Sequence, residues 1–278
     1  MPDGSVSPAR PQGTVPLVRK MGLSFADVPR HWFYGNRFIT HSANALNILF
    51  PAGERFFVRS VKHYLPQITD PLLRKRVRGF FGQEGSHGHE HEQIFDMLES
   101  QGFEVRPWLD WYEKIAYGVL EKTMPPHINL SVTVVLEHFT ASMAEVALTT
   151  EFLDNAPPEM RQLLRWHAAE EIEHKSVAFD VLKQVDPRYW VRMLGMVLGG
   201  AALMLFWRSS TKMLLAQEPG YTKAQIKHDR KTAEDRGQDR QALLRAMRSY
   251  LRRDFHPDDL QTDELAREYL ESIGRLEH

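Results

Sequence analysis

The sequence predicts an all-α protein built as a bundle of long helices. Apolar residues recur at three- and four-residue spacing over long windows, whereas few segments alternate with the period of two that strands show. Prolines and glycines separate these windows where helices are expected to begin and end. Of the 278 residues, 42% are hydrophobic and 26% are charged, so the chain can bury a substantial core.

Start and stop signals place the helices in order along the chain. Pro51 and the pair Asp70-Pro71 suit helix starts, because proline fits the first turn and aspartate caps it. The expected helices cover residues 51–64, 71–100, 108–122, 128–153 and 158–185. Residues 1–30 are expected to form a partly disordered lead-in, residues 31–186 the bundle, and residues 187–278 a C-terminal helical appendage.

Charge and composition exclude several classes of function. The chain carries 35 basic and 36 acidic residues, so nothing indicates nucleic acid as a partner. It contains no cysteine, which excludes disulfides, thiolate nucleophiles and cysteine-ligated metals. Any metal would therefore be held by nitrogen and oxygen atoms, and the 13 histidines become candidates. The start of the chain lacks the apolar stretch of a signal peptide, so a cytoplasmic protein is expected.

A pattern of glutamate and histidine occurs twice. Glu84 and His87 form one Glu-x-x-His pair, and Glu171 and His174 form another. Residues i and i+3 share a helix face, so each pair can converge on one ion. A single glutamate precedes each pair by about 30 residues, which lets neighbouring antiparallel helices bring them to one level of a bundle. These two single glutamates are Glu54 and Glu137.

The pattern predicts a centre for two metal ions. Glu137 lies in the strongly apolar stretch SVTVVLEHFTASMAEVAL, so its carboxylate is expected to be buried, and a buried carboxylate needs a partner. Four carboxylates can neutralise two divalent ions about 4 Å apart, and imidazoles can complete the ligand set. Two iron ions are expected, with manganese or a mixed pair as alternatives. A buried network of salt bridges without metal is the competing interpretation.

The ordered set resembles known di-metal families. A glutamate from each of two helices and Glu-x-x-His from two others is similar to ferritin-like di-iron carboxylate proteins. His167 lies four residues before Glu171 on the same helix face, and this extra histidine resembles the ligand pattern of the p-aminobenzoate N-oxygenase family. That resemblance implies ligation by His167; the alternatives are a base beside the metals or a packed histidine next to Trp166.

A second resemblance extends over most of the chain. The stretches FPAGERFF, GQEGSHGHEH, LEHFTA and WHAAEEIEHKSVAFDV are similar to a bacterial family described as predicted metal-dependent hydrolases. The similarity is expected to run from Leu17 to the C-terminus. It implies a metal-dependent reaction without specifying the substrate.

Three further residues are candidates around the centre. His91 lies four residues after His87 and could reach the metals, and Glu170 could replace Glu171 as the partner of His174. Asp180 is a candidate to accept the second N–H of a ligand histidine.

The leading functional hypothesis is a di-iron oxygenase. It would use O₂ to oxidise a small apolar or amine-bearing substrate by N-oxygenation or C–H hydroxylation, with electrons from a separate reductase or ferredoxin. The alternatives are a di-metal hydrolase that acts through a metal-bound hydroxide, a ferritin-like iron-handling protein, and a structural bundle without metal.

The apolar segment from Trp190 to Trp207 has two open interpretations. Its uncharged run is shorter than the roughly 20 residues that usually span a membrane, which favours a buried helix or a homodimer interface. Aromatic residues at both ends are typical of a membrane interface, and membrane association would suit a lipid-like substrate. Gly195 and Gly199 would let a partner helix approach closely.

Overall fold

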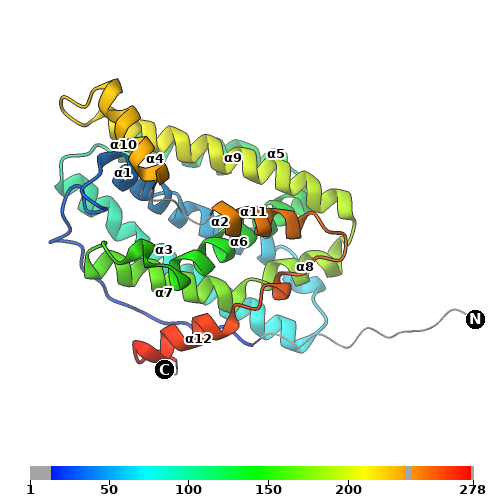
Figure 1. Cartoon of the computed structure of the whole chain (residues 1–278). Coiled ribbons are helices and arrows are strands. Elements are labelled where there is room, and N and C mark those ends of the chain that lie inside the picture. The colour runs from blue at the N-terminus through cyan, green and yellow to red at the C-terminus, as the bar shows by residue number, and fades with distance from the viewer. Residues whose placement is uncertain (1–13, 236–239, 277–278) are drawn as a thin grey trace, which may run out of the picture.

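A computed structural model describes residues 14–235 and 240–276 of the protein, and the first 13 residues of the expected lead-in lie outside these ranges. Within these ranges the regular elements are helices and no strand occurs, which confirms the predicted all-α bundle (Figure 1).

Four helices form the centre of the bundle. They are α2 (Phe50–Lys62), α3 (Pro71–Ser100), α6 (Pro126–Thr149) and α7 (Pro158–His174). Helix α3 has the predicted bounds, and the Asp70 side chain caps it by accepting a hydrogen bond from the Leu72 backbone N–H at 2.8 Å. Helix α2 packs against α3, and α6 packs against both α7 and α2. The predicted single glutamates and Glu-x-x-His pairs therefore lie on four neighbouring helices.

Several helix ends differ from the predictions. The expected helix over 158–185 stops at His174 and resumes after a turn as α8 (Val177–Val185). At this turn Lys175 Nζ donates to Asp263 at 2.6 Å, and the Ser176 hydroxyl accepts from Arg76 at 2.7 Å. These tertiary contacts replace the helix over two residues.

The expected helix over 108–122 is divided into three parts. They are α4 (Arg106–Glu113), a π-helical segment η2 (Lys114–Leu120) and α5 (Glu121–Thr123). Helix α6 ends at Thr149, before the 3₁₀ turn η3 (Glu151–Leu153). An additional helix, α1 (Arg37–Asn47), precedes α2 and was not predicted.

Helix α9 (Tyr189–Ala216) contains the apolar segment and packs along α6 and α1 (Figure 1). The predicted close approach at the two glycines occurs within the chain: a Cβ at Gly195 would lie 2.0 Å from Ser131 Oγ, and one at Gly199 would lie 2.7 Å from Val135 Cγ1. By length and composition α9 could cross a membrane, and 28% of its most apolar window is buried in the bundle.

Shorter helices complete the C-terminal part. They are α10 (Lys223–Asp235), α11 (Arg240–Tyr250), the 3₁₀ turn η4 (Pro257–Asp259) and α12 (Asp263–Ser272), and a 3₁₀ turn η1 (Leu65–Gln67) links α2 to α3. Helix α11 packs against α6, and α12 packs against α7.

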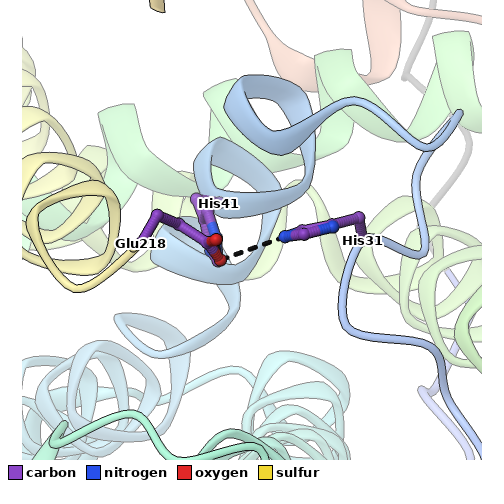
Figure 2. Close-up of side chains that lie close together, drawn as sticks. All are labelled: His31, His41 and Glu218. Atoms are coloured by element: carbon purple, nitrogen blue, oxygen red, sulfur yellow. Dashed lines mark hydrogen bonds and ion pairs between the residues drawn. The ribbon is translucent and has the colours of Figure 1, made fainter. Parts of the chain in front are cut away.

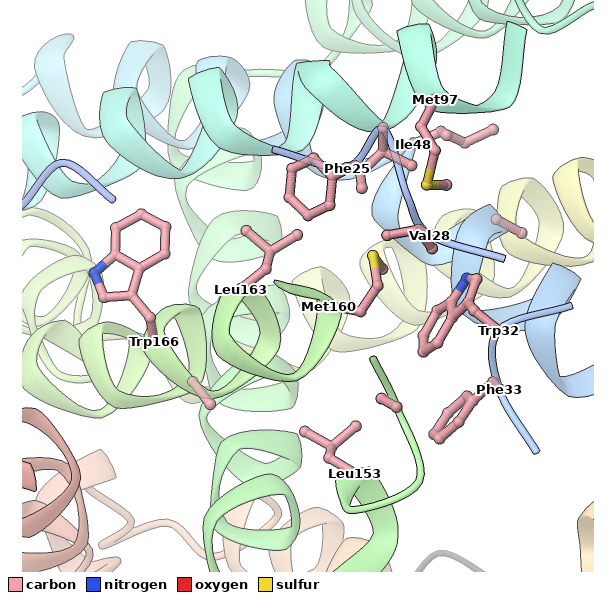
Figure 3. Close-up of a cluster of buried hydrophobic side chains, with 14 of the residues drawn as sticks. Phe25, Val28, Trp32, Phe33, Ile48, Met97, Leu153, Met160, Leu163 and Trp166 are labelled. Carbon is pink, nitrogen blue, oxygen red and sulfur yellow. The ribbon is translucent and has the colours of Figure 1, made fainter. Parts of the chain in front are cut away.

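From residue 14 onward the expected lead-in is packed against the bundle. Phe25, Val28 and Trp32 are buried in one core cluster with Met160 and Leu163 of α7 (Figure 3). Burial of large apolar side chains stabilises this extended segment without regular structure of its own.

Candidate metal centre

All seven predicted ligands converge in the interior of the four-helix centre. Each is less than 5% exposed, although each is a charged or titratable residue. Two groups of three have ligand atoms within 4.8 Å of one another, which suits two ions. The first group is Glu54, His87 and His167, and the second is Glu84, Glu171 and His174. Glu137 adjoins the second group, with Oε2 lying 3.4 Å from His174 Nε2.

Glu171 lies between the two groups. Its Oε1 is 2.8 Å from His167 Nε2, 3.5 Å from His174 Nε2 and 3.7 Å from His87 Nδ1. Its other oxygen accepts a hydrogen bond from the Thr140 hydroxyl. One carboxylate thus faces imidazoles from both groups, an arrangement in which it can bridge two ions.

Close packing of α2 on α3 brings Glu54 into the centre. Gly88 lies on α3 where a Cβ would be 3.1 Å from Glu54 Oε2 and 3.8 Å from Pro51 Cα. A side chain at position 88 would therefore press on the carboxylate. The glycine keeps space for Glu54 at the level of His87.

The buried polar atoms fit a metal. Both carboxylate oxygens of Glu54, Glu84 and Glu137 lack a hydrogen-bond partner, as do His87 Nδ1 and His174 Nε2. A buried polar atom without a partner costs on the order of 1–3 kcal/mol, and more when it is charged. Oxygen and imidazole nitrogen donors that face one another are the ligands of iron, manganese or zinc. The residues present therefore fit a di-metal centre better than a closed network of salt bridges.

Electrostatics also indicate that cations are needed. Burial raises the pKa of Glu54, Glu84 and Glu137 well above the usual value, and neighbouring carboxylates add to the shift. Burial alone would also raise the pKa of Glu171, but the imidazoles of His174 and His167 outweigh it and hold that pKa well below its usual value. Positive charge at this place would stabilise all four carboxylates in the ionised form.

Two side chains contact the imidazoles of His174 and His87 on the side that faces away from the predicted ions. His174 Nδ1 lies 2.9 Å from Gln83 Oε1, which leaves Nε2 directed at Glu84 and Glu137. His87 Nε2 lies 3.0 Å from Glu170 Oε2, which leaves Nδ1 directed at Glu171. Ligand histidines usually donate their second N–H in this way, which fixes the ring and its tautomer.

Glu170 is placed by these contacts as a support of His87 and not as an alternative to Glu171. Its Oε1 accepts hydrogen bonds from Trp166 Nε1 and Arg19 Nη1, each at 3.0 Å. With Oε2 engaged by His87 Nε2, both oxygens of Glu170 already have hydrogen-bond partners.

Arg19 was missed by the sequence analysis. Its guanidinium pairs with Glu170 and with Glu173, and Glu173 in turn accepts from Gln83 at 2.6 Å. Arg19 thus lies behind the supports of both imidazoles. It belongs to a segment interpreted as a lead-in, and only the apolar residues beside it, Leu17, Val18 and Met21, indicated that this segment could be packed.

The other two candidates lie outside the ligand groups. His91 Nε2 is 2.6 Å from His167 Nδ1, so His91 supports His167 from behind, and Phe50 packs on both rings with centroids 4.8 Å away. Asp180 contacts no ligand histidine. It pairs with Arg76 at 2.6 Å and with His256 at 2.9 Å, because α8 turns away from the centre after Lys175.

Two apolar cavities reach the centre. The first is lined by His167 and Glu171 and by Phe33, Met143 and Trp207 among others. The second is lined by Glu54 and lies between η2 and α9. Leu46, Phe50 and Thr140 line both cavities. A substrate with an apolar portion can therefore approach the predicted ions.

Glu170 supports a prediction about metal affinity. Glu170→Gln replaces one accepting oxygen by an amide NH₂, so one of its three donors loses its partner and His87 is held less firmly. We expect metal affinity to fall by roughly 10- to 100-fold, measured by competition with a chromogenic chelator. Glu159→Gln on the same helix is the matched control. Equal affinities for the two variants would contradict a supporting role.

A second cluster of histidine and glutamate lies apart from the centre (Figure 2). Glu218 Oε1 is 2.8 Å from His41 Nε2, 3.0 Å from His31 Nε2 and 3.1 Å from Arg30 Nε. The three donors satisfy this oxygen, and one is a permanently charged guanidinium. The cluster is therefore an ion-pair network, and it joins the end of α9 to α1 and to the N-terminal segment.

This network predicts acid sensitivity. Burial would raise the pKa of Glu218, but hydrogen bonds from His41 and His31 and the charge of Arg30 lower it to about 2. A lowered pKa stabilises the fold above about pH 4.5, and the contribution disappears as the pH falls toward about 2. Glu218→Gln should lower the free energy of unfolding at neutral pH by up to about 3 kcal/mol. Urea titrations at several pH values should show the difference from wild type shrinking in acid; a constant difference would contradict the assignment.

Comparison with known proteins gives one family. A family model described as predicted metal-dependent hydrolase matches residues 17–261. No curated protein and no solved structure matches the chain. The predicted family resemblance is confirmed, whereas the likeness to ferritin-like proteins and to the p-aminobenzoate N-oxygenase family stays a prediction.

The family match corrects the leading functional hypothesis. A hydrolase family favours the hydrolase alternative, so the prediction of a di-iron oxygenase is wrong, whereas the expected reductase or ferredoxin stays a prediction. The cause of the error is chemical: buried carboxylates and imidazoles bind metals that activate either O₂ or water, and the ligands alone do not distinguish the two.

Proposed function

Since the chain belongs to the family of predicted metal-dependent hydrolases, we propose that it hydrolyses an ester or amide bond at the buried di-metal centre. The observation that carries the proposal is the set of buried oxygens of Glu54, Glu84 and Glu137 that lack a hydrogen-bond partner and lie with His87 Nδ1 and His174 Nε2 in one centre. Of the predicted ligands, His167 and Glu171 line the first cavity, and Glu54 lines the second. Donors of this kind bind two divalent cations, and the cavities accommodate a substrate.

The proposed ligands fall into two sets. Glu54, His87 and His167 would hold one ion, and Glu84, Glu137 and His174 the other, with Glu171 between them. When bound, such ions lower the pKa of a water molecule to near neutrality and polarise a carbonyl oxygen. Iron or manganese is the expected metal, because the donors are nitrogen and oxygen and the chain has no thiolate.

The protein side chains supply position and an apolar environment. Gln83 and Glu170 fix the rings of His174 and His87, and the Thr140 hydroxyl fixes Glu171. Glu171 and His167 form the polar end of the first cavity, whose other walls are mainly apolar. A substrate carbonyl would therefore lie at the polar end with its apolar portion along the cavity, and bound substrate would exclude bulk water.

The test combines metal analysis with a substrate panel. The full chain is loaded with ferrous iron, manganese or zinc, metals per chain are measured by mass spectrometry, and turnover is followed on p-nitrophenyl esters and anilides of increasing acyl length. We expect about two ions per chain, hydrolysis that is lost on chelation, and recovery on adding the metal back. Metal-loaded protein that hydrolyses none of these while it consumes O₂ would overturn the proposal.

A further inference from the structure

Helix α9 presents a stripe of large apolar side chains to solvent. Trp190, Leu194, Val197, Leu198, Met204 and Leu205 are between 37% and 65% exposed. At 3.6 residues per turn, these six positions all fall on one side of the helix. We call this stripe the α9 face. Soluble monomers rarely expose a contiguous apolar surface of this kind without a function for it.

The charged side chains within α9 itself have one sign. From Tyr189 to Ala216 the helix contains no acidic residue, and its charged residues are Arg192, Arg208 and Lys212. Arg192 is buried beneath aromatic rings, whereas Arg208 and Lys212 are exposed beyond one end of the stripe. At the other end Arg188 stacks on Trp190 at 4.8 Å and also pairs with Asp186 at 2.5 Å, so the uncompensated cations of the border are Arg208 and Lys212. Tryptophan and arginine at the borders of an apolar stripe are typical of helices that lie in a membrane interface.

The inner side of α9 determines how the helix can meet a membrane. Gly195 and Gly199 face α6, where Ser131 and Val135 occupy the space that side chains would need. The small residues that often join one transmembrane helix to another are thus used within the chain. Because α9 also packs against α1 along the bundle, it would lie parallel to a membrane surface and not cross it.

The second cavity lies under α9. Ala202, Leu203 and Phe206 of α9 form one wall, and Tyr117 and Leu120 of the η2 segment form another. Leu120 is 39% exposed, and its neighbour Val119 is 46% exposed. Glu54 lines the same cavity. A mainly apolar cavity therefore connects an exposed leucine next to α9 with a predicted metal ligand.

We propose that the α9 face seats the protein on a membrane that contains anionic lipids, and that the second cavity takes an amphiphilic ester or amide from that membrane to the metal centre. The docking part rests on the exposed stripe, the cationic borders and the internal use of the glycines. The substrate part rests on the proposed hydrolytic function.

Docking is tested with vesicles and the full chain. Flotation is measured with phosphatidylcholine vesicles with and without phosphatidylglycerol, at low and high salt. We expect binding to the anionic vesicles, and a loss of about tenfold or more in Val197→Glu and Leu205→Glu, because a charge in the interfacial layer is costly. The matched control is Val15→Glu, an exposed valine in the N-terminal segment whose neighbour Pro16 lies against Gly79 of α3. Circular dichroism confirms that each variant is folded.

A second copy of the chain is the alternative occupant of the α9 face. Light scattering in the absence of lipid measures the oligomeric state of wild type and of Val197→Glu. The docking proposal would be overturned if wild type is dimeric, Val197→Glu is monomeric and neither floats with vesicles. These results would identify the α9 face as a dimer interface. Flotation that is equal for wild type, Val197→Glu and Val15→Glu would also overturn it.

The substrate part is tested separately. Turnover of a long-chain ester in vesicles is compared between wild type and Val197→Glu at equal metal content, and we expect a loss of about tenfold or more in the variant. Flotation without hydrolysis of any ester or amide would refute the proposed function while docking stands. Hydrolysis of soluble esters without flotation would refute docking while the function stands. Equal turnover of the vesicle-borne ester by both proteins would refute delivery from the membrane.

Discussion

Glu137→Gln is expected to abolish hydrolysis and to reduce the metal content below two ions per chain. Glu137 is 1% exposed, and both of its oxygens lack a hydrogen-bond partner. An amide in its place presents a neutral oxygen and an NH₂ group that cannot bind a cation. We expect the turnover number to fall by roughly three orders of magnitude, which corresponds to about 4 kcal/mol of lost transition-state stabilisation.

The matched control for this variant lies on the same helix. Glu145→Gln makes the same chemical change two turns further along α6, at a half-exposed position that lines neither cavity. It should retain both ions and full turnover. Glu137→Gln with normal metal content and normal turnover would show that the buried glutamates are structural.

Removal of the metals is expected to destabilise the protein. It should also reverse the sign of the stability change that Glu84→Gln causes. Ions that bind only the folded state at about 1,000 times their dissociation constant stabilise it by roughly 4 kcal/mol, so chelation should lower the melting temperature by on the order of 10 °C. Without ions, the carboxylates of Glu54, Glu84 and Glu137 remain buried beside one another. Glu84→Gln should therefore stabilise the metal-free protein and destabilise the metal-loaded one.

The dependence of stability on pH should also change with metal. Burial and neighbouring carboxylates raise the pKa of Glu54, Glu84 and Glu137 above the unfolded value in the metal-free protein. A raised carboxyl pKa favours the fold below about pH 4.5, and this contribution disappears as the pH rises through the folded pKa. Bound ions require the ionised form, so the metal-loaded protein should lose stability in acid. Calorimetry between about pH 4 and 8 measures how the melting temperature of the metal-free and of the metal-loaded protein depends on pH. Parallel curves for the two forms would contradict metal binding by these carboxylates.

The fold class could be predicted from the sequence alone, and so could the convergence of the predicted metal ligands. Helix α3 has the predicted bounds, because the Asp70-Pro71 start is a local signal that tertiary contacts reinforce. The repeated pattern from Glu54 to His174 predicted which side chains would meet, since helical spacing and similar helix lengths set their level in the bundle. The bounds of α3 and the meeting of the predicted ligands both follow from the regular period of an α-helix.

Contacts between distant segments could not be predicted. The break after His174 depends on Lys175 meeting Asp263 and Ser176 meeting Arg76, and neither pairing has a local signal. For the same reason Asp180 was misplaced: it was expected to accept an N–H from a ligand histidine, but α8 begins after the break and Asp180 pairs with Arg76. The roles of Gln83 and Glu170 needed the positions of the rings that they support. The choice between O₂ and water chemistry needed the family match.

Arg19 has a consequence for how bound ions would leave the protein. Its guanidinium pairs with Glu170 and Glu173 on α7 and also donates to the Arg275 carbonyl oxygen at 2.6 Å. Three segments that are distant in the sequence therefore meet at this one side chain. Local opening of the N-terminal segment would remove the partner of Glu170 and Glu173 while the four central helices stay folded. We expect loss of ions to follow this local opening, so that Arg19→Ala exchanges metal faster than wild type at an unchanged helix content.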